Sequence, residues 1–251
     1  MKSIQYKATP GGAALSLHVF QPEPSRSAGY GKAVLFFHGG GWNGGTPEQF
    51  FPQCRELAQR GWVAMSAEYR VRQRHGTPPT ASVADARSCV RWVLAHAEEL
   101  GIDPDRLVLS GGSAGGHLAL ASLITDAFDD PREDSSIEPR AAGLVLFNPV
   151  ADAGPEGYGY EQVRDVLEDF SPLHAMKKPL PPILILTGAA DTTTPVAGMR
   201  AFRDKAVQFG GACELIEYEG QGHGFFNYND GNNPCYRQTL DEMIRFLERI
   251  F

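Results

Sequence analysis

The sequence has few of the features that mark metal sites, disulfide frameworks or membrane spans. Its four cysteines are scattered, and neither a C-x-x-C nor an H-E-x-x-H motif is present. We therefore expect reduced thiols, no bound metal and no cofactor. No apolar stretch approaches the ~20 residues of a transmembrane helix, and residues 1–12 lack the apolar core of a secretory signal. We expect a cytoplasmic protein with no membrane partner.

Positive charge is also scarce. The chain has 23 Lys and Arg against 30 Asp and Glu, a formal net charge of −7, and no run of basic residues. Because nucleic acids bind clustered positive charge, we expect no nucleic-acid partner. The 42% hydrophobic content and the length of 251 residues fit a single globular domain over 1–251. The sequence leaves open whether the chain forms a homo-oligomer.

Strand-like and helix-like segments alternate along most of the chain. The apolar run 33–37 is typical of a parallel strand buried on both faces. The pattern predicts strands at 4–7, 15–20, 33–37, 62–67, 107–109, 143–147, 183–187 and 213–218, and helices at 47–60, 82–100, 117–125, 198–209 and 236–251. This alternation predicts a mainly parallel sheet covered on both faces, with ligand chemistry at the carboxyl ends of the strands.

Three segments interrupt this rhythm. The stretches 22–31 and 71–80 contain prolines and predict loops. The longer excursion 151–182 contains Tyr158, Tyr160, a helix-like piece near 161–168 and several prolines. It could be a lid or a substrate wall above the sheet, or a surface insertion with no role.

One segment carries a catalytic signature. The apolar strand 107–109 runs through Gly111-Gly112-Ser113-Ala114-Gly115 directly into a helix-like pattern. A G-x-S-x-G turn this tight strains the serine backbone and needs small neighbours, because a Cβ there would collide with the strand or helix. The helix N-terminus below favours negative charge. We interpret Ser113 as a nucleophile; the alternative is a glycine-rich turn with an ordinary serine.

A serine nucleophile needs a base, and the base needs an acid. Among seven histidines, His223 follows the last predicted strand in a glycine-rich loop. Asp191 stands just past the apolar strand 183–187, between Ser113 and His223 in chain order. Asp165 and Asp169 are competing acids within the excursion. An N-cap role for Asp191 and an ordinary loop role for His223 are the alternatives.

A glycine run follows the predicted strand 33–37. In His38-Gly-Gly-Gly-Trp42, successive glycines let main-chain N–H groups turn toward one point, where they and the N–H of Ala114 could bind a tetrahedral oxyanion. His38 then anchors the loop. Residues 39–44 also match G-x-G-x-x-G, with Glu68 after the next strand, which is the pattern of a dinucleotide site. That interpretation leaves Ser113 unexplained, and Trp42 would crowd a pyrophosphate.

Together these motifs resemble the α/β-hydrolase superfamily. The H-G-G-G-W at 38–42 is similar to the hormone-sensitive-lipase-like esterases and the related feruloyl/acetyl carbohydrate esterases. The resemblance implies an α/β-hydrolase fold and serine-esterase activity on a small-molecule ester. It implies that Ser113 is the nucleophile, His223 the base and Asp191 the acid. It also implies that the N–H groups of Gly40, Gly41 and Ala114 bind the oxyanion. The tripeptide 68–70 also resembles that branch, where we interpret it as structural.

The chain departs from the lipase-like members at its start. Only residues 1–32 precede the predicted oxyanion strand, too few for a large cap, so we expect an open site and short acyl esters. We expect Trp42, Tyr158, Tyr160 and Phe225 to shape the substrate pocket. Two other functions stay open: a kynurenine-formamidase-like amide hydrolase, and a non-catalytic binding protein with the same fold.

Overall fold

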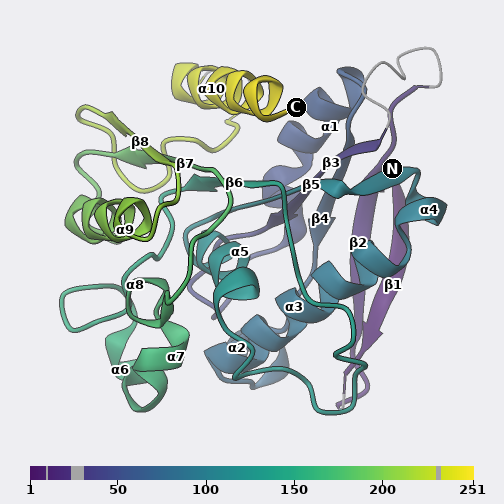
Figure 1. Cartoon of the computed structure of the whole chain (residues 1–251), viewed down its shortest axis with the longest axis horizontal. Coiled ribbons are helices and arrows are strands. Elements are labelled where there is room, and N and C mark those ends of the chain that lie inside the picture. Colours follow the sequence, from purple (N-terminus) through teal and green to yellow (C-terminus); the bar gives the residue numbers. More distant parts are fainter. Residues whose placement is uncertain (10, 24–30, 230–232) are drawn as a thin grey trace.

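Eight strands form one sheet in the order β1-β2-β4-β3-β5-β6-β7-β8 (Figure 1). The computed structural model describes residues 1–9, 11–23, 31–229 and 233–251. The strands are β1 (Lys2–Ala8), β2 (Ala14–Phe20), β3 (Gly31–Phe37), β4 (Val63–Ala67), β5 (Ile102–Gly112), β6 (Gly143–Phe147), β7 (Ile183–Gly188) and β8 (Cys213–Tyr218). β2 pairs antiparallel with β1 and β4, and the other pairs are parallel. The predicted mainly parallel sheet is confirmed.

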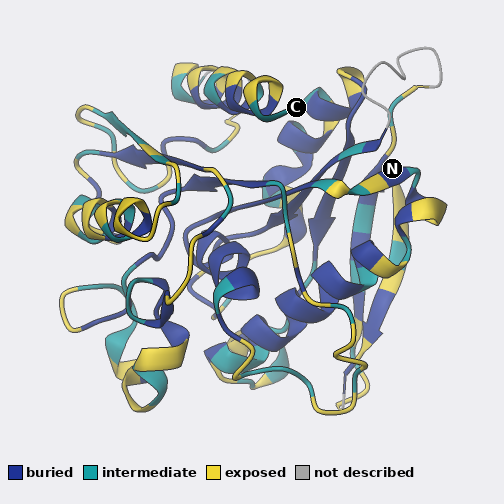
Figure 2. Cartoon of the chain, viewed as in Figure 1, coloured by how far each residue is buried: buried dark blue, intermediate teal, exposed yellow. Residues whose placement is uncertain are grey.

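Helices cover both faces of the sheet. Side chains from α3 (Pro79–Ala95), α5 (Ala114–Ile124) and α9 (Val196–Gln208) belong to one core cluster, and those from α1 (Phe51–Gln59) and α10 (Pro234–Ile250) to the other. Neighbouring residues of the central strands separate between them: Leu35 packs in the first cluster and Phe36 in the second, as the alternation of a strand requires. The central strands and α5 are therefore almost wholly buried (Figure 2).

Three predicted segments differ from the structure by more than small shifts at their ends. The helix predicted at 82–100 divides at His96 into α3 and α4 (Ala97–Leu100), and His96 Nδ1 lies 2.8 Å from the carbonyl oxygen of Trp92. The one predicted at 47–60 begins as the 3-10 turn η2 (Pro47–Phe50). The loop predicted at 71–80 was wrong in part, because it contains the single turn α2 (Arg72–His75) before Gly76 at φ 64°. The loop predicted at 22–31 lies mostly outside the described residues.

The excursion between β6 and β7 packs against the rest of the domain. It contains α6 (Tyr160–Val163), η3 (Arg164–Val166), α7 (Leu167–Phe170) and α8 (Pro172–Ala175), which gather beside α9 and below the carboxyl ends of the strands in Figure 1. Phe170 is fully buried and stacks on His117 of α5 at 4.3 Å between ring centroids. Within the described ranges, no helix is long and apolar enough to cross a membrane.

Candidate active site

Ser113 sits at a sharp turn between β5 and α5, with φ 54° and ψ −121°. The glycines around it leave no room for a side chain. A Cβ on Gly111 would lie 2.5 Å from the carbonyl carbon of Gly115, and one on Gly115 would lie 2.0 Å from the carbonyl oxygen of Phe37. Both distances are far inside van der Waals contact, so small residues are a steric requirement at this turn.

The three residues expected to form a triad come together. His223 Nε2 is 2.9 Å from Ser113 Oγ, and His223 Nδ1 is 2.7 Å from Asp191 Oδ2. A carboxylate accepts, so Nδ1–H donates to Asp191 and Nε2 is left to accept the serine proton. The competing acids lie elsewhere: the Asp165 side chain is 93% exposed beside Arg164, and Asp169 is exposed on α7.

The carboxylate of Asp191 combines the two roles that the sequence left open. Its Oδ1 accepts from the N–H groups of Thr193 (2.8 Å) and Thr194 (3.0 Å), which fixes the turn. Its Oδ2 accepts from His223, from the Thr194 hydroxyl and from the amide of Asn148. Burial raises the pKa of Asp191, but these hydrogen bonds outweigh it and hold the pKa well below its usual value. The acid therefore stays ionised.

Asn148 is a site residue that the sequence reasoning missed. It directly follows β6, has φ 43°, and is fully buried with its Nδ2 on Asp191. Its N–H donates to the carbonyl of Leu186 in β7 at 2.9 Å, which brings it beside the strand that carries the acid. The available signal was a polar residue immediately after an apolar strand, at the edge where ligand chemistry is expected.

The glycine run after β3 turns sharply. Gly40 has φ 121° and Gly41 φ 61°, and a Cβ on Gly40 would lie 2.3 Å from the carbonyl oxygen of Gly44. Within the described residues, no hydrogen bond engages the N–H of Gly40 or Gly41. Ala114 is the first residue of α5, so its N–H has no partner within the helix. These donors are therefore available to a ligand beside Ser113.

Residues that flank the glycine run hold it from behind. The His38 ring stacks on Tyr69 at 4.1 Å between centroids, and the Tyr69 hydroxyl donates to the His38 carbonyl at 2.7 Å. Burial lowers the pKa of His38 to about 4. Arg70 pairs with the buried Asp85 at 2.7 Å. Glu68, the acid of the dinucleotide alternative, accepts from the N–H of Ser16 at 2.8 Å. These contacts give residues 68–70 a structural role.

The catalytic groups face a cavity of about 230 Å³. Its lining comes mostly from the glycine run, η2, the excursion and the loop after β8 that carries His223, called the histidine loop below. The lining residues are Gly39, Gly40, Gly41, Gln49, Ser113, Tyr158, Thr193, His223, Gly224, Phe226 and Asn227. Of the four aromatic residues expected there, only Tyr158 is present. Its hydroxyl fills the space beside Gly41, where a Cβ would lie 2.2 Å from it.

The other three aromatic residues lie outside this lining. Trp42 has φ 58°, is 1% exposed, and packs against the rings of His117 and Phe170. Phe225 is buried against Tyr218, and its neighbour Phe226 faces the cavity instead. Tyr160 begins α6 and is half-buried. Sequence position alone did not reveal the direction of these side chains.

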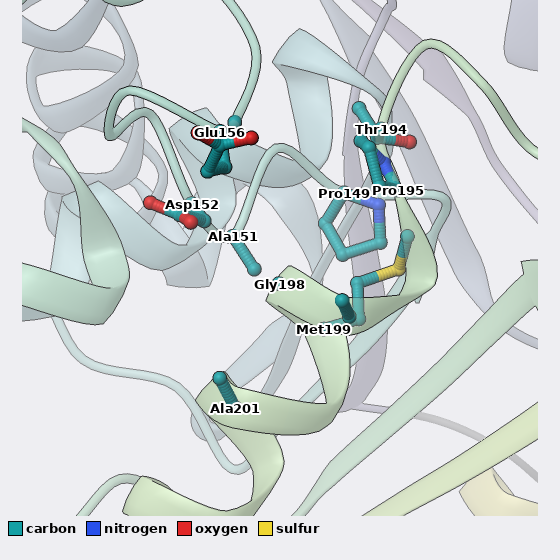
Figure 3. Close-up of a pocket in the computed structure, with 11 residues that line it drawn as sticks. Pro149, Ala151, Asp152, Glu156, Thr194, Pro195, Gly198, Met199 and Ala201 are labelled. Carbon is teal, nitrogen blue, oxygen red and sulfur yellow. The ribbon is translucent and has the colours of Figure 1, made fainter.

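A second cavity, of about 460 Å³, lies between the start of the excursion and the start of α9. Figure 3 shows Asp152 and Glu156 on one side of it and Thr194, Pro195 and Met199 on the other. Consecutive residues line the two cavities, since Thr193 lines the smaller one and Thr194 the larger one. Ser113 and His223 line only the smaller cavity.

Comparison with known proteins agrees with this geometry. The BD-FAE family model matches residues 17–147, and a TAP-like protein model matches residues 163–248. Esterase 2 of Thermogutta terrifontis, solved with propionate bound, is 41% identical over 99% of this chain and 94% of its own, with a TM-score of 0.91. The structure of the same esterase phosphonylated by sarin is 39% identical, again over 99% of this chain and 94% of its own, with a TM-score of 0.92.

Curated relatives point the same way. The esterase LipC of Mycobacterium tuberculosis is 29% identical over 226 residues, 76% of this chain and 52% of its own length. The probable carboxylic ester hydrolase LipM of the same organism is 31% identical over 71% of this chain and 46% of its own length. The chain thus spans about half the length of these curated relatives. It belongs to the BD-FAE family, within the α/β-hydrolase esterases.

Proposed function

We propose that the chain is a serine carboxylic-ester hydrolase that acts on short acyl esters. The observation that carries this proposal is the hydrogen-bonded series Ser113–His223–Asp191 facing a cavity beside unpaired glycine N–H groups. A nucleophile, an oriented base and preorganised donors are the three requirements of acyl transfer at a serine.

The chemistry runs in two halves. Ser113 Oγ attacks the ester carbonyl carbon while His223 Nε2 takes its proton, and the carbonyl oxygen becomes an oxyanion held by N–H groups of Gly40, Gly41 and Ala114. The tetrahedral intermediate collapses to an acyl-Ser113, and the alcohol leaves with the proton from His223. Water then attacks the acyl carbon by the same route and releases the acid. The anionic Asp191 stabilises the imidazolium in both halves.

The size of the cavity supports short acyl groups. About 230 Å³ is available beside Ser113, and the aromatic rings of Tyr158 and Phe226 bound it. The Thermogutta esterase has been solved with propionate and with butyrate bound. A formamide could use the same triad, so a kynurenine-formamidase-like activity is the second candidate.

A substrate panel tests the proposal. p-Nitrophenyl acetate, butyrate, octanoate and decanoate are compared with an aryl formamide, using the wild type and Ser113→Ala. We expect turnover of acetate and butyrate, and a loss of about four to six orders of magnitude in kcat for Ser113→Ala. Faster formamide cleavage would favour the amidase. Absence of turnover on every substrate would favour a non-catalytic binding protein.

A further inference from the structure

Two separate loops carry the groups of the proposed reaction. The glycine run follows β3, whereas His223 follows β8. These strands are not neighbours, because β5, β6 and β7 lie between them in the sheet. Pairing between adjacent strands therefore does not by itself set the distance from the oxyanion donors to the imidazole. A direct hydrogen-bonded connection across the cavity would set this distance.

Gln49 in η2 makes such a connection. Its Oε1 accepts from the N–H of Gly39 at 2.6 Å, and its Nε2 donates to Asn227 Oδ1 at 2.9 Å. Because a backbone N–H can only donate, the Gly39 contact fixes which end of the amide is oxygen. The other end must then donate across the cavity. A carboxamide is the side-chain group that accepts at one end and donates at the other in this geometry.

Asn227 is held on its own side. Its N–H donates to the carbonyl of Gly224, one residue after His223, at 3.1 Å. The side chain of Asn233 donates to the carbonyl oxygens of Phe225 (2.6 Å) and Asn227 (2.8 Å). Asn233 also accepts from the N–H of Cys235 and so caps α10. The histidine loop is thus tied to a long helix at one end and to Gln49 at the other.

We propose that Gln49 and Asn227 are positioning residues that hold the oxyanion loop at a fixed separation from His223. The inference rests on the proposed hydrolase, since it assigns a role within that reaction. Neither side chain needs to touch the reacting atoms. Gly39 directly precedes the two glycines that offer their N–H groups, so a shift of Gly39 moves those donors. A displacement of about 1 Å in such a site can cost about a hundredfold in rate.

The test removes the bridge from either end. Gln49→Met and Asn227→Leu keep side-chain bulk but lose the hydrogen bond, and the double variant lacks both partners. The control is Asn229→Leu, an exposed asparagine of the same loop. Hydrolysis of p-nitrophenyl butyrate is measured, with kcat expressed per site titrated by an organophosphonate. Thermal unfolding of each variant shows whether the fold is kept.

We expect each bridge variant to lose about tenfold to a hundredfold in kcat per titrated site, with KM changed little. The double variant should be no worse than the poorer single variant, because both substitutions break the same contact. Asn227→Asp keeps an acceptor for the Gln49 amide and should recover most of the rate. Losses that multiply in the double variant, or a kcat per titrated site that stays at the wild-type value, would overturn the proposal.

Amide hydrogen exchange gives a readout that does not need turnover. Asn227→Leu should speed exchange in the peptide containing residues 38–41, on the far side of the cavity, and Asn229→Leu should not. Unchanged exchange there would also overturn the bridge. If the wild type hydrolyses no ester, the proposed function fails by itself, and the exchange result still decides whether Gln49 couples the two loops.

Discussion

The carboxylate of Asp191 separates its two tasks between its two oxygens. Oδ1 accepts from the backbone of Thr193 and Thr194, and Oδ2 faces His223. Replacement by asparagine would leave the turn with one acceptor but present an NH₂ group or a neutral oxygen to the imidazole. The ring would lose the anion that orients it and stabilises its charged form.

We predict that Asp191→Asn lowers kcat for p-nitrophenyl acetate by about 10⁴-fold, the effect of the same change in a well-studied triad. Its thermal unfolding should stay near that of the wild type, because the turn keeps its backbone contacts. Asp165→Asn, at an exposed position in the excursion, is the matched control and should keep full activity. If Asp165→Asn were the impaired variant, the acid would lie in the excursion.

The site residues found from the sequence share one property. Ser113, Asp191 and His223 each follow a predicted strand, so topology alone brings them to one edge of the sheet. Gln49 and Asn227 were missed, because their roles depend on partners far along the chain that only the fold brings near. Asn148 also follows a predicted strand and was overlooked although it carries the same signal. The structure places Trp42, Tyr160 and Phe225 outside the lining of the smaller cavity, and Trp42 and Phe225 are buried in the core.

At the scale of elements, the turn from β5 to α5 is the most sterically constrained. Gly115 lies in the first turn of α5, where alanine would ordinarily favour the helix. Here a Cβ would meet the carbonyl oxygen of Phe37 in β3 at 2.0 Å. Backbone on both sides must shift to relieve this contact, so local helix propensity and tertiary packing oppose each other.

We predict that Gly115→Ala destabilises the protein by about 1–3 kcal/mol, the usual cost of overpacking a filled site. Urea unfolding at neutral pH measures it. Gly11→Ala is the control, because nothing lies within 4 Å of a Cβ at that position. An unchanged unfolding midpoint for Gly115→Ala would mean that β3 and α5 can separate without cost.

The excursion contributes one side chain to the cavity. Tyr158 lies over Gly41 and packs against Trp42 at 5.6 Å between ring centroids. Its bulk limits the space beside Ser113. We predict that Tyr158→Ala raises the ratio of kcat/KM for octanoate over butyrate, since each added methylene that finds apolar surface contributes about 0.8 kcal/mol.

The chain-length profile of Tyr158→Phe is the control for this change, because phenylalanine keeps the ring and removes only the hydroxyl. Its preference should remain close to that of the wild type. If Tyr158→Ala still strongly prefers butyrate, another wall sets the acyl limit, and the excursion would be a packed insertion without a role in substrate choice. That is the alternative the sequence left open for residues 151–182.

Elements were predicted well wherever periodicity was strong. All eight strands occur within a few residues of their expected places, because runs such as 33–37 and 183–186 are apolar throughout. β5 is longer than expected. Its first half carries polar residues, so the apolar pattern predicted only its second half. The single-turn helices α2 and α8 were not predicted from the sequence, and the helix-like piece expected near 161–168 is divided into α6, η3 and α7. Helices this short depend on packing more than on local propensity.

Across the whole molecule, buried ion pairs join distant segments. Arg87 and Arg91 of α3 both pair with Asp129, in the loop after α5. Arg87 is 1% exposed, so its buried charge is compensated mainly by Asp129, with Glu138 farther away at 3.8 Å. Burial raises the pKa of Asp129, but hydrogen bonds from the two guanidinium groups outweigh it and lower the pKa below its usual value. The same balance lowers the pKa of Asp191.

These lowered values give the protein a defined response to acid. A carboxyl group whose pKa is lower in the folded state binds protons more tightly when unfolded, so acidification favours unfolding. Its stabilising contribution is present above the unfolded pKa of about 3.9 and is lost as pH falls toward the folded pKa.

We predict that the free energy of unfolding measured in urea changes little between pH 7 and 5 through these groups and drops steeply below pH 4. Asp129→Asn should be less stable at pH 7, because it removes the nearest anion from Arg87 and Arg91, and its stability should fall less steeply below pH 4. A variant curve parallel to that of the wild type at every pH would show that Asp129 has the same proton affinity folded and unfolded, and that the acid response arises at other carboxylates.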